Sequence, residues 1–130
     1  MPAPTILIID DDKLIRWSLS TMLGRAGYSI REAATGKEGL AAIESGTADL
    51  ALLDIMLPDM DGFAVLDVIR HAHPELPVLT MTADSTPEAV RQALRLGARG
   101  HLEKPCDPAA LLAAVSEALQ SITPPGQISQ

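Results

Sequence analysis

The chain has 130 residues, a length that suits one domain with one core. Hydrophobic residues make up 47% of it and aromatic residues only 2%, so the core must be aliphatic. The formal net charge of -7 argues against a nucleic-acid-binding surface, which needs clustered Lys and Arg. A single cysteine, Cys106, excludes an internal disulfide and suits a reducing compartment.

No apolar stretch approaches the roughly 18 residues that a membrane span needs. No basic region precedes the first apolar run, which argues against a signal peptide. We therefore expect a cytoplasmic protein with no direct contact to a membrane.

Strand-like and helix-like segments alternate five times, which predicts a parallel sheet with helices on both faces. Short apolar runs predict strands at about 5–9, 29–33, 50–53, 78–81 and 100–102. Apolar periodicity predicts helices at about 14–26, 35–46, 63–72, 86–96 and 107–121. A capping box at Thr35-Gly36-Lys37-Glu38, and proline after a cap residue at Thr86-Pro87 and Asp107-Pro108, mark helix starts. Gly27 suits a left-handed cap after the first helix.

The last eight residues differ in composition from the rest of the chain. Residues 123–130 are dominated by Pro, Gly, Ser and Gln, which is typical of a linker. We expect a single domain over residues 1–122 and a linker-like tail over residues 123–130.

Two of the apolar runs end in carboxylates. Asp10-Asp11-Asp12 follows the first run, and Asp54 ends the third. An open α/β sheet builds its site at the carboxyl ends of its strands, so Asp10, Asp11 and Asp54 converge if these strands are neighbours. Two carboxylates about 4 Å apart repel by roughly 4 kcal/mol at an effective dielectric near 20.

A chain keeps such a cluster when it binds a hard cation, shares a proton, or uses one carboxylate as a nucleophile. Capping of the first helix accounts for one carboxylate, that of Asp12. It does not account for three in a row beside a second strand that also ends in Asp. A divalent cation with oxygen ligands fits the cluster better than capping does. Mg2+ is such an ion, because it accepts one or two carboxylates and often bridges to a phosphoryl oxygen.

Thr82 follows the fourth strand and Lys104 follows the fifth, so both are expected at the same sheet edge as Asp54. A lysine and a cation can neutralise phosphoryl oxygens, and a hydroxyl can hydrogen-bond one of them. This combination of positioning and charge is what phosphoryl transfer requires.

Together, Asp10-Asp11, Asp54, Thr82-Ala83 and Lys104-Pro105 resemble the receiver domain of two-component response regulators. The resemblance covers about residues 5–121 and implies a flavodoxin-like (βα)5 doubly wound sheet with strand order 2-1-3-4-5. Ile15-Arg16-Trp17 and Met81-Thr82-Ala83 are similar to the nitrogen-regulator (NtrC) class. That similarity implies a parent protein with a downstream ATPase and DNA-binding domain.

The resemblance implies that Asp54 accepts a phosphoryl group from the phosphohistidine of a sensor histidine kinase. It implies Mg2+ as the cofactor, with Asp11, Asp54 and the backbone carbonyl of Met56 as direct ligands. Asp10 would act through a bound water.

The resemblance further implies that Thr82 and Lys104 contact the phosphoryl group, and that the Lys104-Pro105 bond is cis. Receiver domains usually couple the threonine to an aromatic residue on the fifth strand, where this chain has His101. This is a departure, since histidine is smaller than tyrosine and can carry charge near neutral pH. We expect His101 to swing inward on phosphorylation, less decisively than an aromatic residue would.

The predicted function is a phosphoacceptor switch that changes the surface of the fourth helix, fifth strand and fifth helix, with homodimerisation on phosphorylation as one outcome. Such a domain catalyses its own phosphorylation and dephosphorylation, so we expect a switch more than a conventional enzyme. A downstream transcription-regulating effector is expected outside this chain.

Three alternatives stay open. A stand-alone receiver would relay its signal by protein contact alone. A Mg2+-dependent aspartyl phosphohydrolase usually has a second Asp two residues beyond the nucleophile, where this chain has Met56. A flavodoxin-like mononucleotide carrier needs a phosphate-cradling loop rich in Gly, Ser or Thr after the first strand, where Asp10-Asp11-Asp12 would repel phosphate.

Overall fold

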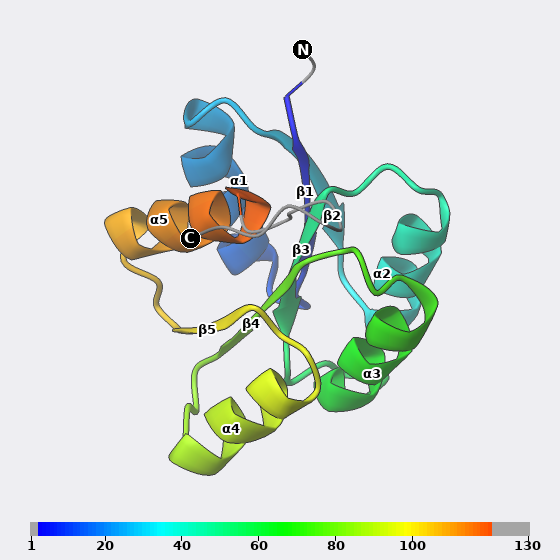
Figure 1. Cartoon of the computed structure of the whole chain (residues 1–130). Coiled ribbons are helices and arrows are strands. Elements are labelled where there is room, and N and C mark those ends of the chain that lie inside the picture. The colour runs from blue at the N-terminus through cyan, green and yellow to red at the C-terminus, as the bar shows by residue number, and fades with distance from the viewer. Residues whose placement is uncertain (1–2, 121–130) are drawn as a thin grey trace, which may run out of the picture.

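The computed structural model describes residues 3–120 and shows a parallel five-stranded sheet in the order β2-β1-β3-β4-β5 with helices on both faces (Figure 1). The strands are β1 (Thr5–Ile9), β2 (Ser29–Ala33), β3 (Leu50–Asp54), β4 (Val78–Thr82) and β5 (Gly100–Glu103). The helices are α1 (Lys13–Arg25), α2 (Gly36–Glu44), α3 (Gly62–Ala72), α4 (Pro87–Arg95) and α5 (Pro108–Gln120). The predicted fold class and strand order are confirmed.

Every predicted strand and helix forms, and most ends differ from the prediction by one or two residues. Gly27 takes a φ of 102 after α1, the left-handed conformation for which it was singled out. The predicted helix end at residue 121, the domain end at 122 and the tail over 123–130 lie outside the described residues. In the described part of the chain, no helix is both long and apolar enough to cross a membrane.

The central strands are buried on both faces, which explains their continuous apolar sequence. Ile6 and Ile8 of β1 pack into a core cluster with side chains of α1 and α5. Leu7 and Ile9 point the other way, into a second cluster with side chains of α2, α3 and α4. Each buried aliphatic side chain contributes about 1.5–3 kcal/mol, so the two clusters hold both helical layers against the sheet.

The strand register brings the ends of β1, β3, β4 and β5 to one edge. β1 and β3 pair with Ile9 opposite Leu53, so Asp10 and Asp54 occupy equivalent positions on neighbouring strands. Asp54 stands opposite Met81 of β4, immediately before Thr82. This edge therefore carries Asp10, Asp54 and Thr82.

A tight backbone approach fixes the loop between β3 and α3. The Gly62 N–H donates to the Ile55 carbonyl oxygen at 2.8 Å. A Cβ atom at residue 62 would overlap with backbone atoms of Ile55, which cannot move without disturbing β3. A Cβ atom added at Gly24 in α1, by contrast, would enter open space.

We predict opposite effects for alanine at these two glycines. Gly62→Ala is expected to lower the free energy of unfolding by about 2 kcal/mol, because the added methyl overpacks backbone. Gly24→Ala, the matched control, is expected to raise it by about 0.5 kcal/mol, because alanine loses less conformational entropy in a helix. Urea unfolding measures the free energy of unfolding of both variants. A Gly62→Ala chain as stable as the wild type would contradict the close approach of the Gly62 and Ile55 backbones.

Candidate functional site

Three carboxylates converge at the carboxyl edge of the sheet. Asp10, Asp11 and Asp54 each offer an oxygen, and these oxygens lie within 4.8 Å of one another. Asp10 is fully buried and Asp54 is 4% exposed, whereas Asp11 is exposed. Asp11 is thus the member of the cluster that faces solvent.

Lys104 holds the two buried carboxylates together. Its Nζ lies 2.6 Å from Asp10 Oδ2 and 2.8 Å from Asp54 Oδ2, and its side chain is 11% exposed. The Lys104 backbone N–H donates to the Thr82 carbonyl oxygen at 3.0 Å, which ties the end of β5 to β4. The Lys104–Pro105 bond is cis, as the resemblance implies.

Burial and charge act against each other on this pair. Burial raises the pKa of Asp54 above its ordinary value, although the hydrogen bonds from Lys104 and the Met56 N–H oppose the shift. Burial alone would lower the pKa of Lys104, but its close contacts with the Asp10 and Asp54 carboxylates and their charges raise it overall. Lys104 therefore stays protonated, and ionised Asp54 depends on it.

The donor set fits a divalent cation. Three carboxylates outnumber the one ammonium by two charges, which a dication would balance. Asp10 Oδ2 makes the ion pair with Lys104 but no hydrogen bond of good geometry in the described part of the chain. A buried acceptor with spare capacity beside an exposed carboxylate suits Mg2+, which binds one or two carboxylates and keeps several waters.

The loop after β3 completes the surroundings of Asp54. The Met56 N–H donates to Asp54 Oδ1 at 2.9 Å, so each oxygen of this carboxylate has a partner. Asp59 anchors the same loop, because its carboxylate accepts the backbone N–H groups of Gly36 and Lys37 at the start of α2. These two bonds lower the pKa of Asp59. The loop carrying the Met56 carbonyl is thereby held in place.

Thr82 and His101 lie beside this site. Thr82 is buried, and its Oγ1 accepts the Asp84 N–H at 3.2 Å. His101 is already tied to β4 and to the loop that follows it: its Nδ1 lies 2.8 Å from Thr80 Oγ1 and its Nε2 lies 2.8 Å from Ser85 Oγ. Burial lowers the pKa of His101, with a smaller opposing effect of Glu103. An inward swing of this ring would have to break both contacts.

Sequence reasoning missed the partners of the site. It did not connect Thr80 and Ser85 with His101, or Arg16 with Asp10, whose backbone oxygen accepts a bond from Arg16 Nη1 at 2.7 Å. A polar Thr80 inside a buried apolar strand is a signal that could have been read. Arg16 lies one turn after the helix cap at Asp12, on the helix that leaves the acidic loop.

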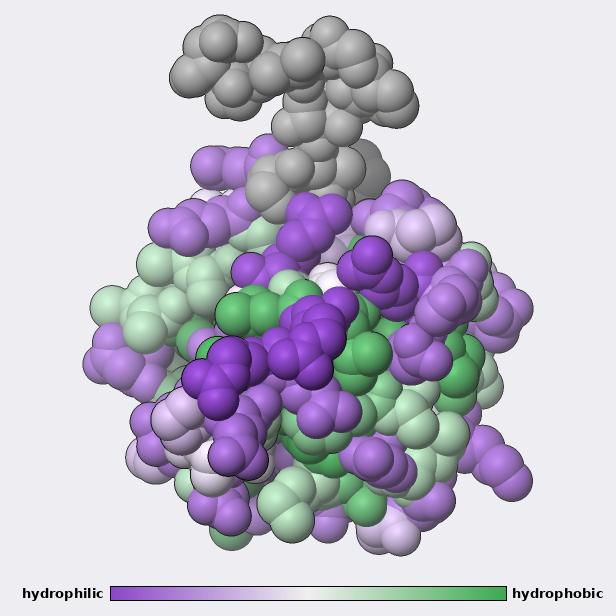
Figure 2. Space-filling model, turned by 60° about the horizontal axis from the view of Figure 1, so that its bottom comes forward, coloured by the Kyte–Doolittle hydropathy of each residue, from purple (hydrophilic) through white to green (hydrophobic). Residues whose placement is uncertain are grey.

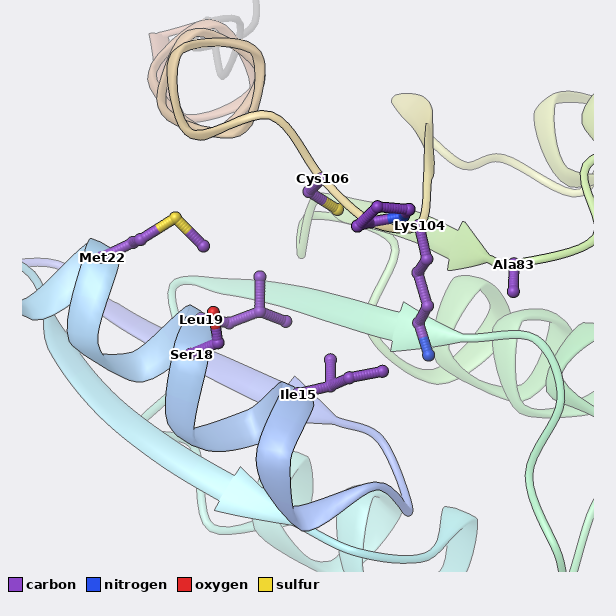
Figure 3. Close-up of a pocket in the computed structure, with 8 residues that line it drawn as sticks. Ile15, Ser18, Leu19, Met22, Ala83, Lys104 and Cys106 are labelled. Atoms are coloured by element: carbon purple, nitrogen blue, oxygen red, sulfur yellow. The ribbon is translucent and has the colours of Figure 1, made fainter.

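A cavity of about 330 Å3 lies beside Lys104, between α1 and the segment that leads from β5 to α5. In Figure 3, which draws the residues that line this cavity, the side chains of Lys104 and of Ile15 in α1 extend toward each other. Leu19, Met22 and Cys106 make much of the wall apolar.

Figure 2 shows the surface at the lower end of the molecule as it is drawn in Figure 1. Strongly hydrophilic side chains gather in the middle of this surface, with hydrophobic side chains beside them.

The family model of the response regulator receiver domain matches residues 6–116. The DNA-binding transcriptional regulator NtrC of Salmonella typhimurium is 42% identical over 114 residues, which cover 88% of this chain and 24% of that protein. The transcriptional regulatory protein GltR of Pseudomonas aeruginosa is 40% identical over 119 residues, which cover 89% of this chain and 49% of that protein. The chain thus spans about a quarter of the length of its NtrC relatives.

Solved structures agree with these matches. The receiver domain of NtrX from Brucella abortus has a TM-score of 0.85 and 36% identity, covering 89% of this chain and 98% of that one. A CheY-like receiver domain protein from Methanospirillum hungatei has a TM-score of 0.86 and 37% identity, covering 91% and 94%. With five strands in receiver order, an acidic cluster at their carboxyl edge and a lysine joining it, the chain belongs to the receiver domains of two-component response regulators and is similar to those of the NtrC type.

Proposed function

We propose that this domain is a phosphoacceptor switch that takes a phosphoryl group from a histidine kinase onto Asp54. The observation that carries the proposal is the Lys104 ammonium, which contacts the carboxylates of Asp54 and Asp10 at once in a nearly buried site. A cation placed there keeps a carboxylate ionised in spite of its burial, as a nucleophile must be. It also stabilises charge that develops on a transferred phosphoryl group.

In the proposed reaction an oxygen of the Asp54 carboxylate attacks phosphorus, and an O–P bond forms as the P–N bond of the phosphohistidine breaks. The electron pair of the broken bond stays on the imidazole. Asp11, Asp54 and the Met56 carbonyl would hold Mg2+ directly, and Asp10 through a water. When bound, this ion would neutralise phosphoryl oxygens. Lys104 and Thr82 would contact the remaining oxygens of the phosphorylated site, and hydrolysis would reset the switch.

The partners follow from the same chemistry. A sensor histidine kinase would supply the phosphoryl group, and the α4-β5-α5 surface, with homodimerisation as one outcome, would pass the signal on. NtrC and GltR, named as transcriptional regulators, extend well beyond the region that this chain matches, which supports a downstream transcription-regulating effector. The alternative of a stand-alone receiver is favoured by the chemotaxis protein CheY4 of Vibrio cholerae, since this fold spans 98% of that chain.

We predict that acetyl phosphate with Mg2+ adds one phosphoryl group to the chain. The adduct should be absent in Asp54→Asn, which keeps the shape of the side chain but removes its nucleophilic charge, and absent when a chelator removes the metal. Intact-mass spectrometry measures both. Asp67→Asn, which alters an exposed carboxylate on α3, is the matched control and should be modified like the wild type. Modification of Asp54→Asn to the wild-type extent would contradict the proposal.

We predict that Lys104→Met raises the pKa of Asp54 further, because the lysine lowers it through a hydrogen bond and through charge. Carboxyl-detected NMR titration measures this pKa, and Lys37→Met, which removes a lysine from the start of α2, is the control.

The raised pKa of Asp54 also makes stability depend on pH. At pH values between the ordinary pKa of an aspartate and the pKa of Asp54 in the folded chain, the folded state binds more protons than the unfolded state. Its contribution to stability therefore falls as the pH rises through this interval. An unchanged or lower pKa of Asp54 in Lys104→Met would contradict the coupling.

We predict that a phosphoryl mimic bound with Mg2+ changes the NMR signals of both ring nitrogens of His101, because an inward swing breaks the contacts with Thr80 and Ser85. The exposed ring of His71 on α3 serves as an internal control and should not respond. Backbone signals around Asp54 that shift while those of the His101 ring stay unchanged would rule out this residue as part of the switch.

A further inference from the structure

Side chains of α1 and β2 support the loop that carries Asp10 and Asp11. Arg16 of α1 contacts the backbone of this loop, and its Nη1 donates to the Asp10 carbonyl oxygen at 2.7 Å. Its Nε donates to Glu32 Oε1 of β2 at 3.2 Å, and the other oxygen of Glu32 accepts from Ser20 Oγ at 2.9 Å. The Arg16 side chain is only 14% exposed, whereas that of Glu32 is 43% exposed, so the bond from Arg16 to the Asp10 carbonyl is the more sheltered of these contacts.

This contact matters because of where the Asp10 carbonyl lies. The Asp10 N–H still bonds to the sheet, donating to the Ala33 carbonyl oxygen at 3.1 Å. The Asp10 carbonyl is the first one beyond β1, where the chain turns out of the sheet toward Asp11. Arg16 therefore fixes the plane of the peptide that joins Asp10 to Asp11. The orientation of that plane decides where the exposed Asp11 carboxylate stands relative to Asp54.

We infer that Arg16, oriented by Glu32, is a positioning residue that holds the Asp10–Asp11 peptide so that the acidic cluster is ready to bind a divalent cation. The inference rests on the proposed function, because it concerns the metal that this function requires. Residues behind metal ligands commonly change metal affinity by about 10- to 100-fold when they are altered.

A competing effect has the opposite sign, which makes the inference testable. The guanidinium is a positive charge near a site for a dication, so through charge alone its removal would tighten Mg2+ binding. Through positioning, its removal weakens Mg2+ binding. Lysine separates the two further, because it keeps the charge but cannot donate in two directions from one planar group.

Isothermal titration calorimetry with MgCl2 on the whole chain gives the test. We expect Arg16→Gln and Arg16→Lys each to raise the Kd for Mg2+ by about 10-fold. Arg25→Gln, the same charge change on an exposed residue of the same helix, should bind Mg2+ like the wild type. Glu32→Gln, which leaves Arg16 in place but removes the charge that orients it, should give a smaller increase in Kd. A wild-type Kd in Arg16→Gln, or tighter binding, would overturn the inference.

Two further readouts separate positioning from a general loss of stability. Thermal unfolding identifies variants that are unfolded at the temperature of the titration, and a role in stability alone lowers Tm without changing the Kd of the folded chain. Without metal, amide exchange at Asp12, whose N–H donates to Asp10 Oδ1 at 2.9 Å, should quicken in Arg16→Lys and stay unchanged in Arg25→Gln. Unchanged exchange at Asp12 in Arg16→Lys would also overturn the inference. A wild-type chain that binds no Mg2+ would instead remove the proposed function itself.

Discussion

One ammonium group shared by two buried carboxylates is the interaction on which the site depends. Asp10 and Asp54 end neighbouring strands whose side chains are packed on both faces, so neither can move away from the other. Lys104 reaches them from the end of β5, two strands away from β3 at the same edge of the sheet, and offsets their repulsion. One lysine leaves the cluster with excess negative charge, which is what the proposed binding of a dication requires.

The fold separates a rigid part from a part that can change. β1 and β3 are held by the core clusters on both faces, which keeps Asp10 and Asp54 in a fixed relation. β5 lies at the edge of the sheet, and His101 binds it to β4 and to the loop that leads to α4 through two side-chain contacts. A change at Thr82 or Lys104 would therefore reach the edge strand at little cost, because few buried contacts resist it.

Most of the helices and strands and the place of the site could be predicted from the sequence, because the signals are local, whereas the strand order was implied only by the family resemblance. Apolar runs, cap residues and glycines mark each element, and strands that end at or just before Asp54, Thr82 and Lys104 must meet at one edge once the sheet is parallel. The supporting contacts could not be predicted in this way. The bond from Arg16 to the Asp10 carbonyl and the caps that Asp59 supplies to α2 depend on side-chain conformations between distant segments. The contacts of His101 with Thr80 and Ser85 depend on the register of β4 and β5, which sequence periodicity does not set.

The central claim is that the carboxylate of Asp54 accepts the phosphoryl group. Borohydride reduces an aspartyl phosphate to homoserine, which marks the acceptor permanently, and peptide mass spectrometry then locates it. The account predicts homoserine at position 54 alone, and only in samples that were phosphorylated in the presence of Mg2+. Homoserine at Asp10, Asp11 or any other aspartate, with Asp54 left intact, would contradict it.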